Sequence, residues 1–176
     1  MQDKIKKEST EPFYFDYETP IGIIRIEEKR GFLSGLYLQQ KHHFSVKKKT
    51  AYYRETDFIR KVYGQLMEYF DGKRKVFDLP LYIEGTPFQQ KVWNALRQIP
   101  YGETRSYGEI AAQVGNPKAC RAVGGANHHN PIMIVIPCHR VIGKDGSLTG
   151  FGGGIEAKDY MLRLEKGVRN ADSEFK

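Results

Sequence analysis

The residues of this chain best suited to do chemistry stand together at Cys138, His139 and Arg140. A cysteine reacts as its thiolate, and a neighbouring imidazole or guanidinium is a feature that lowers the pKa of a thiol. The triplet therefore favours a nucleophilic sulfur. A free cysteine also serves as a small apolar side chain in many protein cores, so this second interpretation stays open on composition alone.

The segment before the triplet predicts how the sulfur is held. Residues 132–136 form an apolar run of strand length after Asn130 and Pro131, and Pro137 follows the run directly. A run bounded by turn residues is typical of a buried strand. We therefore expect Cys138 at the end of a strand, at the boundary of the core, with its direction fixed by Pro137.

The residues from Thr86 onward predict helices around this strand. Thr86, Pro87 and Gln89 fit a helix start with a capping box and a proline in the first turn. A shorter helix over residues 107–114, a break at residues 115–117 and a further helix give a helix-turn-helix arrangement. The buried face of the first helix should consist of Phe88, Val92, Trp93 and Leu96.

The last of these helices, with Pro117 in its first turn, is made largely of small residues and carries the long cation Arg121 in its middle. Such a surface can approach a nucleic-acid backbone closely. Tight packing within a domain favours Ala and Gly as well, so both interpretations stay open on the pattern alone.

The first half of the chain predicts a sheet covered by a helix. Residues 13–15, 22–28 and 32–38 are short runs rich in Ile, Phe and Tyr, typical of an antiparallel sheet, and residues 76–83 could add a strand. From Thr56, apolar residues recur at helical spacing until Gly72. They are Phe58, Val62, Leu66 and Phe70, with Ile59, Tyr63 and Met67 beside them.

Composition limits the classes of function. A net charge of +7 is compatible with a polyanionic partner without requiring one. No run approaches the roughly 18 apolar residues of a membrane span, so we expect no membrane partner and a cytoplasmic location, or a nuclear one in a eukaryote. Two cysteines are too few for a disulfide framework or a structural zinc site, and we expect no cofactor or metal. The His pairs at residues 42–43 and 128–129 and the lysines at residues 47–49 are interpreted as surface.

These motifs together resemble the O6-alkylguanine-DNA alkyltransferases. The sequence Pro-Cys-His-Arg-Val at residues 137–141 follows Gly-Gly-Ala at residues 124–126 and Asn130, with Ser-Tyr at residues 106–107 and Arg-Ala-Val-Gly at residues 121–124 in family register. The resemblance runs from about Thr86 to Glu165 and is highly specific as a combination. The first half resembles the family only in its layout of strands and a helix.

The resemblance implies an α+β fold in two domains. Residues 1–85 would form a small, mainly structural α/β domain, an antiparallel sheet plus a helix that is ribonuclease-H-like. Residues 86–168 would form a mostly helical, winged-helix-like domain with the helix-turn-helix, and residues 169–176 a flexible tail.

The implied function is DNA repair. An alkyl group, such as methyl, would pass from O6-alkylguanine, and less efficiently from O4-alkylthymine, in duplex DNA to Cys138 after the nucleotide is flipped out. A thioether is a poor leaving group, so the transfer would be irreversible and stoichiometric. The partner would be double-stranded DNA, and the protein itself a monomer.

The resemblance also assigns roles to single residues. Glu165 would orient His139, which would deprotonate Cys138 through a water, while Asn130 braces the preceding turn and Tyr107 donates a hydrogen bond to the departing guanine. Taken alone, Glu165 fits a solvated helix face and Tyr107 fits a core. DNA contacts are implied for Arg121, which would fill the vacated stack, and for Ala122, Gly124, Ala126 and Tyr107.

The substrate pocket is implied by the same analogy. The backbone N–H of Gly152 would serve O6, and the carbonyls of Cys138 and Val141 would accept the exocyclic amine. Met133 and Phe151 would shape the pocket. The sequence departs from relatives at Met133, Asn127 and Gly152, which affects the lid over the pocket. The zinc site of some relatives needs cysteines in the first half, which this chain lacks.

Two other functions compete with alkyl transfer. The first is a non-catalytic, alkyltransferase-like protein that only binds lesions, but such a binder has no need of Cys138, His139 and Glu165 together. The second is a cysteine hydrolase with a Cys-His pair, which would need an oxyanion hole and leaves the DNA-facing helix unexplained.

Overall fold

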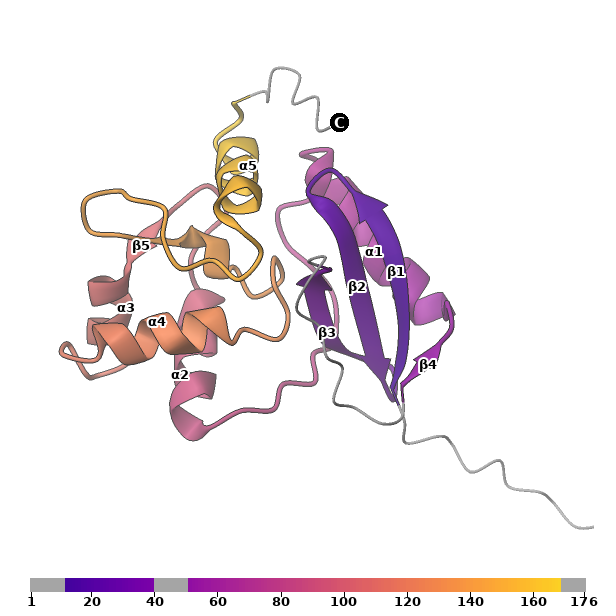
Figure 1. The fold of residues 1–176 in the computed structure, drawn as a ribbon, viewed down its shortest axis with the longest axis horizontal. Helices are drawn as coiled ribbons and strands as arrows, with labels where there is room; N and C mark the ends of the chain where they lie inside the picture. Colours follow the sequence, from indigo (N-terminus) through magenta and orange to yellow (C-terminus); the bar gives the residue numbers. More distant parts are fainter. Residues whose placement is uncertain (1–11, 40–50, 169–176) are drawn as a thin grey trace, which may run out of the picture.

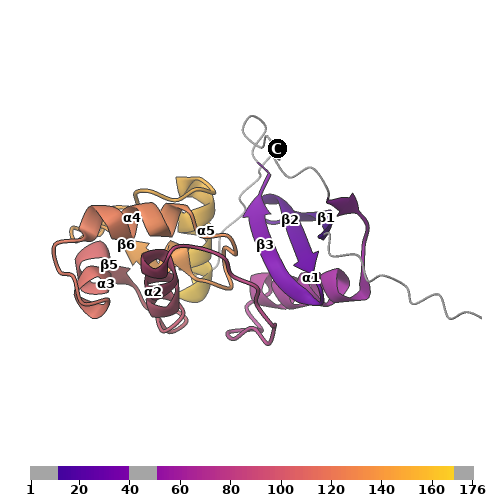
Figure 2. The same ribbon diagram turned by 90° about the horizontal axis from the view of Figure 1, so that it is seen from below.

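The structure, a computed structural model, describes residues 12–39 and 51–168. Its elements gather in two groups that lie side by side, a sheet with one long helix and a set of shorter helices (Figures 1 and 2). The first group contains β1 (Phe13–Thr19), β2 (Gly22–Lys29), β3 (Phe32–Leu38), β4 (Tyr52–Tyr53) and α1 (Asp57–Phe70). This arrangement confirms the α+β class and the predicted antiparallel strands.

The sheet has the strand order β3-β2-β1-β4, in which β1, β2 and β3 are antiparallel and β4 is parallel to β1. Side chains alternate between its faces as the strand pleat requires. Ile24 and Ile26 are fully buried on the inner face, whereas Arg25 between them pairs with Asp16 of β1 at 2.8 Å. The sheet therefore has one apolar face, and α1 packs on β1 and β2.

Helix α1 begins and ends where the sequence predicts. The Thr56 hydroxyl accepts a hydrogen bond from the Ile59 N–H at 3.1 Å, and Gly72 adopts a positive φ of 72° just past the end of the helix. Its buried residues include Tyr69, in the last turn, which the predicted apolar stripe did not contain. The buried face of α1 therefore differs in part from the predicted apolar stripe.

The second group contains α2 (Pro87–Leu96), β5 (Arg105–Ser106), α3 (Tyr107–Gln113), α4 (Cys120–His128), η1 (Cys138–Arg140), β6 (Val141–Ile142) and α5 (Ile155–Glu165). The predicted capping box of α2 is present, with Thr86 and Gln89 bonding each other's backbone N–H groups. Strands β5 and β6 pair in parallel, Arg105 with Val141. This pairing sets the start of α3 beside the residues that follow Cys138.

Three predicted elements differ in the structure. Residues 132–136 are not a regular strand, because they fold into a turn closed by a bridge between Met133 and Ile136. Helix α4 starts at Cys120 rather than Pro117, because Pro117 lies in a preceding turn closed by the Ala119 N–H on the Asn116 carbonyl. Residues 76–83 form only an isolated bridge rather than a strand. The Gln65 side chain of α1 donates to the Asp78 carbonyl and accepts from the Asp78 N–H, so a side chain takes the bonds that a neighbouring strand would make.

One apolar core extends through both groups, from Ile24 and Ile26 of the sheet to Val123 of α4 and Met161 of α5. Backbone hydrogen bonds cross between the groups as well. The Leu36 N–H donates to the Pro131 carbonyl and the Met133 N–H donates to the Leu36 carbonyl, both at 2.9 Å. The segment that leads to Cys138 is therefore attached directly to the edge of the sheet.

The tail at residues 169–176, the His pair at residues 42–43 and the lysines at residues 47–49 lie outside the described residues. Within residues 12–39 and 51–168, no helix has the length and apolarity needed to cross a membrane. The same residues contain no cluster of three or more His, Cys, Asp or Glu side chains arranged for a metal ion.

Candidate active site

Cys138 begins the short 3-10 helix η1 and is 4% exposed. Its N–H donates to the Ile136 carbonyl at 2.8 Å, and its own carbonyl accepts from the Asn127 side chain at 3.3 Å. Both bonds fix the backbone of the cysteine, so the sulfur is held rigidly at the boundary of the core.

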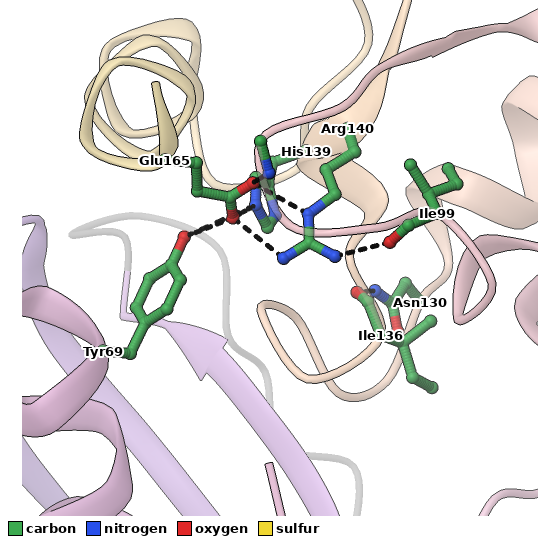
Figure 3. Close-up of polar contacts among 8 residues, drawn as sticks. Tyr69, Ile99, Asn130, Ile136, His139, Arg140 and Glu165 are labelled. Carbon is green, nitrogen blue, oxygen red and sulfur yellow. Dashed lines mark hydrogen bonds and ion pairs between the residues drawn. The ribbon is translucent and has the colours of Figure 1, made fainter. Parts of the chain in front are cut away.

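Asn130 closes the turn that carries the cysteine. Its side-chain amide donates to the Ile136 carbonyl at 2.7 Å (Figure 3), and its oxygen accepts from the Ile132 N–H at 3.0 Å. Inside this turn Ile134 has a φ of 70°, a conformation that a β-branched residue adopts only under strain. The side chain of Asn130 therefore supplies hydrogen bonds that a neighbouring strand would otherwise provide.

His139 is fully buried and pairs with Glu165 at the end of α5. Its Nε2 lies 2.6 Å from Oε1 of Glu165. Because an ionised carboxylate only accepts hydrogen bonds, Nε2 carries a proton and Nδ1 is left as an acceptor. Nδ1 is buried and bonds to no described residue. The imidazole is therefore arranged to take a proton at Nδ1.

The guanidinium of Arg140 is engaged by Glu165 and by the Ile99 carbonyl, and the groups that lower the pKa of Cys138 are Asn130 and Lys158 instead. The guanidinium donates to Glu165 Oε2 through Nε at 2.8 Å, to Glu165 Oε1 at 3.1 Å, and to the Ile99 carbonyl at 2.7 Å (Figure 3). The sequence-based expectation that Arg140 lowers the pKa of Cys138 is therefore wrong. Adjacent positions in a 3-10 helix project in different directions, and Glu165 is the better partner for a guanidinium.

Glu165 is the centre of this network. Besides His139 and Arg140, it accepts hydrogen bonds from the Tyr69 hydroxyl at 2.8 Å and from the Gly102 N–H at 3.1 Å. Burial alone would raise the pKa of this carboxyl, but the donors from His139 and Arg140 outweigh burial and lower the pKa to about 2. Glu165 is therefore an ionised, fixed acceptor.

The resting site holds a neutral thiol and a neutral imidazole. Burial raises the pKa of Cys138 to about 11, and a hydrogen bond from Asn130 and the charge of Lys158 offset this only in part. Burial also lowers the pKa of His139, in spite of the adjacent carboxylate of Glu165. A sulfur nucleophile in this site must lose its proton to a base during the reaction, because it is not a thiolate at rest.

Lys158 is a residue of this site that sequence reasoning missed. It is fully buried on α5, and its ammonium donates to the carbonyls of Val141 at 2.5 Å and Thr149 at 3.1 Å. Burial lowers its pKa to about 8, and a negative charge on the Cys138 sulfur acts to raise it. Its place three residues before Met161 on the buried face of α5 was the only signal in the sequence.

Tyr107 lies over the site at the start of α3. Its hydroxyl donates to the Thr149 carbonyl at 2.9 Å, and burial raises its pKa. It is close enough to Cys138 for their charges to interact. Of the other predicted pocket residues, Met133 and Val141 are buried and Phe151 is half-buried, whereas Gly152 is exposed and faces His128.

Helix α4 presents part of its small-residue surface to solvent. Arg121 and Ala122 are exposed, and Gly124 is half-buried beside the ring of Tyr107. Ala126 differs from the expectation, because its side chain is buried in the core and its carbonyl accepts from the Trp93 indole at 2.8 Å. Small size at Ala126 thus serves helix packing rather than an outward surface.

The sequence of this chain is similar to the sequences of known proteins. Residues 87–167 match the family model of the 6-O-methylguanine DNA methyltransferase DNA-binding domain. The methylated-DNA–protein-cysteine methyltransferase of Methanosarcina acetivorans is 47% identical over 154 residues, covering 87% of this chain and 97% of that protein. The constitutive enzyme of Bacillus subtilis is 48% identical over 157 residues, covering 88% and 95%.

Solved structures agree. The O6-methylguanine methyltransferase of Mycobacterium tuberculosis superposes with a TM-score of 0.82 at 45% identity, covering 92% of this chain and 96% of that chain. Mycobacterium tuberculosis OGT in complex with DNA gives a TM-score of 0.80 at 46% identity, covering 89% and 94%. Since nearly the whole length matches at close to half identity, this chain belongs to the family of methylated-DNA–protein-cysteine methyltransferases.

Proposed function

We propose that this protein repairs duplex DNA by moving the alkyl group of O6-alkylguanine onto the sulfur of Cys138. The observation that carries the proposal is the pairing of a neutral His139, protonated on Nε2 by its bond to Glu165, with a neighbouring thiol that has to lose a proton. The solved complex of a relative with DNA supports DNA as the partner.

The transfer proceeds by displacement at the alkyl carbon. His139 Nδ1 takes the thiol proton through a bridging water, and Glu165 stabilises the imidazolium that forms. The sulfur then forms a bond to the alkyl carbon as the bond to O6 breaks, and the electron pair goes to the guanine, which gains a proton. Lys158 stabilises the transient thiolate. The products are a thioether at Cys138 and an unmodified guanine in the DNA, so each molecule acts once.

The pocket assignments follow the same proposal. Tyr107 donates to the departing guanine, and the Gly152 N–H serves O6. In the free protein the Tyr107 hydroxyl donates to Thr149, so a bound base has to replace that bond. The carbonyls of Cys138 and Val141 accept the exocyclic amine with their second lone pairs, because Asn127 and Lys158 already use one on each. Met133 and Phe151 bound the space for the alkyl group.

DNA binding is assigned to the exposed part of α4. Arg121 enters the stack when the damaged nucleotide is flipped out, and Ala122 and Gly124 let the helix approach the minor groove. We extend the proposal to O4-alkylthymine as a poorer substrate. We also propose a domain boundary after residue 85, with a ribonuclease-H-like first domain, a winged-helix-like second domain and a monomeric protein.

Mass spectrometry tests the proposed function directly. A duplex oligonucleotide with one O6-methylguanine should add one methyl group, and no more, to the peptide that bears Cys138, and the lesion should revert to guanine. A matched control is Cys120→Ser, which removes the exposed cysteine and should leave the transfer intact. Release of methanol with turnover would indicate a hydrolase, and tight lesion binding without any added mass would indicate a binder.

A further inference from the structure

Tyr69 is a buried residue of the sheet-and-helix group that reaches the active-site network. It lies in the last turn of α1, is fully buried, and donates its hydroxyl to Glu165 Oε1 at 2.8 Å. Figure 3 shows its side chain pointing from α1 toward the carboxylate of α5. The two residues are 96 positions apart in the chain. A residue from the first half thus bonds the acid that holds the catalytic imidazole.

The hydrogen bond falls on the oxygen that matters for proton transfer. Glu165 Oε1 lies 2.6 Å from His139 Nε2 and 2.8 Å from the Tyr69 hydroxyl, so both donors share this atom, with Arg140 Nη2 as a third donor at 3.1 Å. The hydroxyl and Nε2 are 3.5 Å apart, too far for a strong direct bond. Tyr69 therefore acts on His139 through the carboxylate.

Packing does not require the hydroxyl. The Tyr69 ring contacts the rings of Phe70, Phe77 and Tyr101 at centroid distances of 5.4 to 6.2 Å, and a phenylalanine would keep these contacts. Burial and the charge of Glu165 raise the pKa of Tyr69 well above its ordinary value. The hydroxyl therefore stays neutral and remains a donor through the whole reaction.

We propose that Tyr69 is a positioning residue for the transfer reaction, because its hydroxyl sets the proton affinity of His139 by competing for Glu165 Oε1. The inference rests on the proposed function and deepens it. It gives the first half of the chain a part in the chemistry, in addition to the mainly structural role expected from the sequence.

The direction of the effect follows from the shared oxygen. Without the hydroxyl, Oε1 accepts more strongly from His139 and stabilises the imidazolium, so the pKa of His139 rises. The other groups that face the pair stay in place: Arg140 of η1, Lys158 of α5, Tyr101 after α2, and Cys138. His139 then remains protonated, and unable to act as a base, up to a higher pH.

The test is the pH profile of single-turnover methyl transfer by the full chain, measured with the O6-methylguanine duplex between pH 5.5 and 9. Tyr69→Phe should move the rising limb of the rate to higher pH by about half a unit or more. The rate should therefore drop at least about threefold on the acidic side and approach that of the unchanged protein at alkaline pH. Affinity for the undamaged duplex should not change.

Tyr63→Phe is the matched control. Tyr63 lies on the same helix, stacks on Tyr17 at 3.9 Å and places its hydroxyl 3.5 Å from the Glu18 carbonyl, away from Glu165. Its profile should superimpose on that of the unchanged protein. Site-specific 3-fluorotyrosine at position 69, a stronger donor with the same shape, should move the limb to lower pH.

The measured pH profiles either support or refute the role of Tyr69. Superimposed profiles for Tyr69→Phe and the unchanged protein would overturn the role of Tyr69, and so would a uniform rate loss with the limb in place. If Tyr69→Phe does not fold, the 3-fluorotyrosine protein decides, and an unmoved limb refutes the proposal. Absence of transfer by the unchanged protein would instead refute the proposed function itself.

Discussion

The lowered pKa of Glu165 predicts how the stability of the protein depends on pH. Burial acts to raise its pKa, but the bonds from His139 and Arg140 lower it from 4.5 to about 2. A carboxyl group with a lowered pKa in the fold stabilises the protein above its unfolded pKa, and this stabilisation is lost as the pH falls toward the folded value. The difference in pKa corresponds to about 3 kcal/mol at neutral pH.

The perturbation is Glu165→Gln, which keeps the shape and removes the charge. At pH 7 the variant should be less stable than the unchanged protein by about 3 kcal/mol, because Arg140 and His139 lose an ionised acceptor. By pH 3 about 2 kcal/mol of this difference should have disappeared, because the unfolded carboxyl group is then protonated. Titrating groups that do not contact Glu165 are common to both proteins, so their effects cancel in the comparison.

Urea unfolding provides the assay. Trp93 is the single tryptophan of the chain and is buried, so its fluorescence reports the transition. Unfolding free energies of both proteins are compared at pH 7, 5, 4 and 3. A stability difference that stays constant over this range would refute the reasoning, because it would show that a protonated Glu165 stabilises the fold as much as an ionised one.

Three further predictions concern single side chains. Arg121→Ala should slow methyl transfer from a duplex by a factor at least about ten times larger than the factor by which it slows transfer from the free base O6-benzylguanine. The reason is that Arg121 acts on the base stack, which the free base lacks. Equal losses in the two rate measurements would remove this role. Lys158→Met should raise the pKa of the Cys138 thiol further, measured by the pH dependence of its alkylation in a Cys120→Ser background, and slow transfer about tenfold or more. An unchanged thiol titration would contradict the assigned contact. Asn130→Ala should lower the free energy of unfolding by about 2 to 4 kcal/mol, because it leaves the Ile136 carbonyl and the Ile132 N–H without their partner; a loss under about 0.5 kcal/mol in urea unfolding would show that the turn does not need the amide.

Local signals predicted the elements well. Thr86 and Gln89 determine the start of α2 through bonds between neighbours, and Thr56 does the same for α1, so sequence alone is sufficient there. Residues 132–136 were mispredicted because their backbone bonds come from Asn130 and from Leu36, which is distant in the chain. Hydrophobic periodicity carries no information about such partners.

In the active site, too, residues identified by local signals were predicted and residues that depend on distant contacts were not. Cys138 and His139 were identified from adjacent residues, and Glu165 only from its register with a family motif. Tyr69 and Lys158 were missed, because an aromatic residue and a lysine on apolar helices look like ordinary core and surface positions. Their significance depends on distances of 2.8 Å and 2.5 Å to Glu165 and Val141, which only the tertiary fold creates.

The attachment of the Pro131–Met133 backbone to Leu36 also has a meaning for the order of assembly. During synthesis β3 leaves the ribosome almost a hundred residues before Met133 does, and domains generally fold from the N-terminus as the chain emerges. The sheet edge can therefore exist as a template when the reactive segment arrives, and the strained turn at Ile134 closes against a finished surface. A chain lacking its first half would have to form that turn with nothing to dock on.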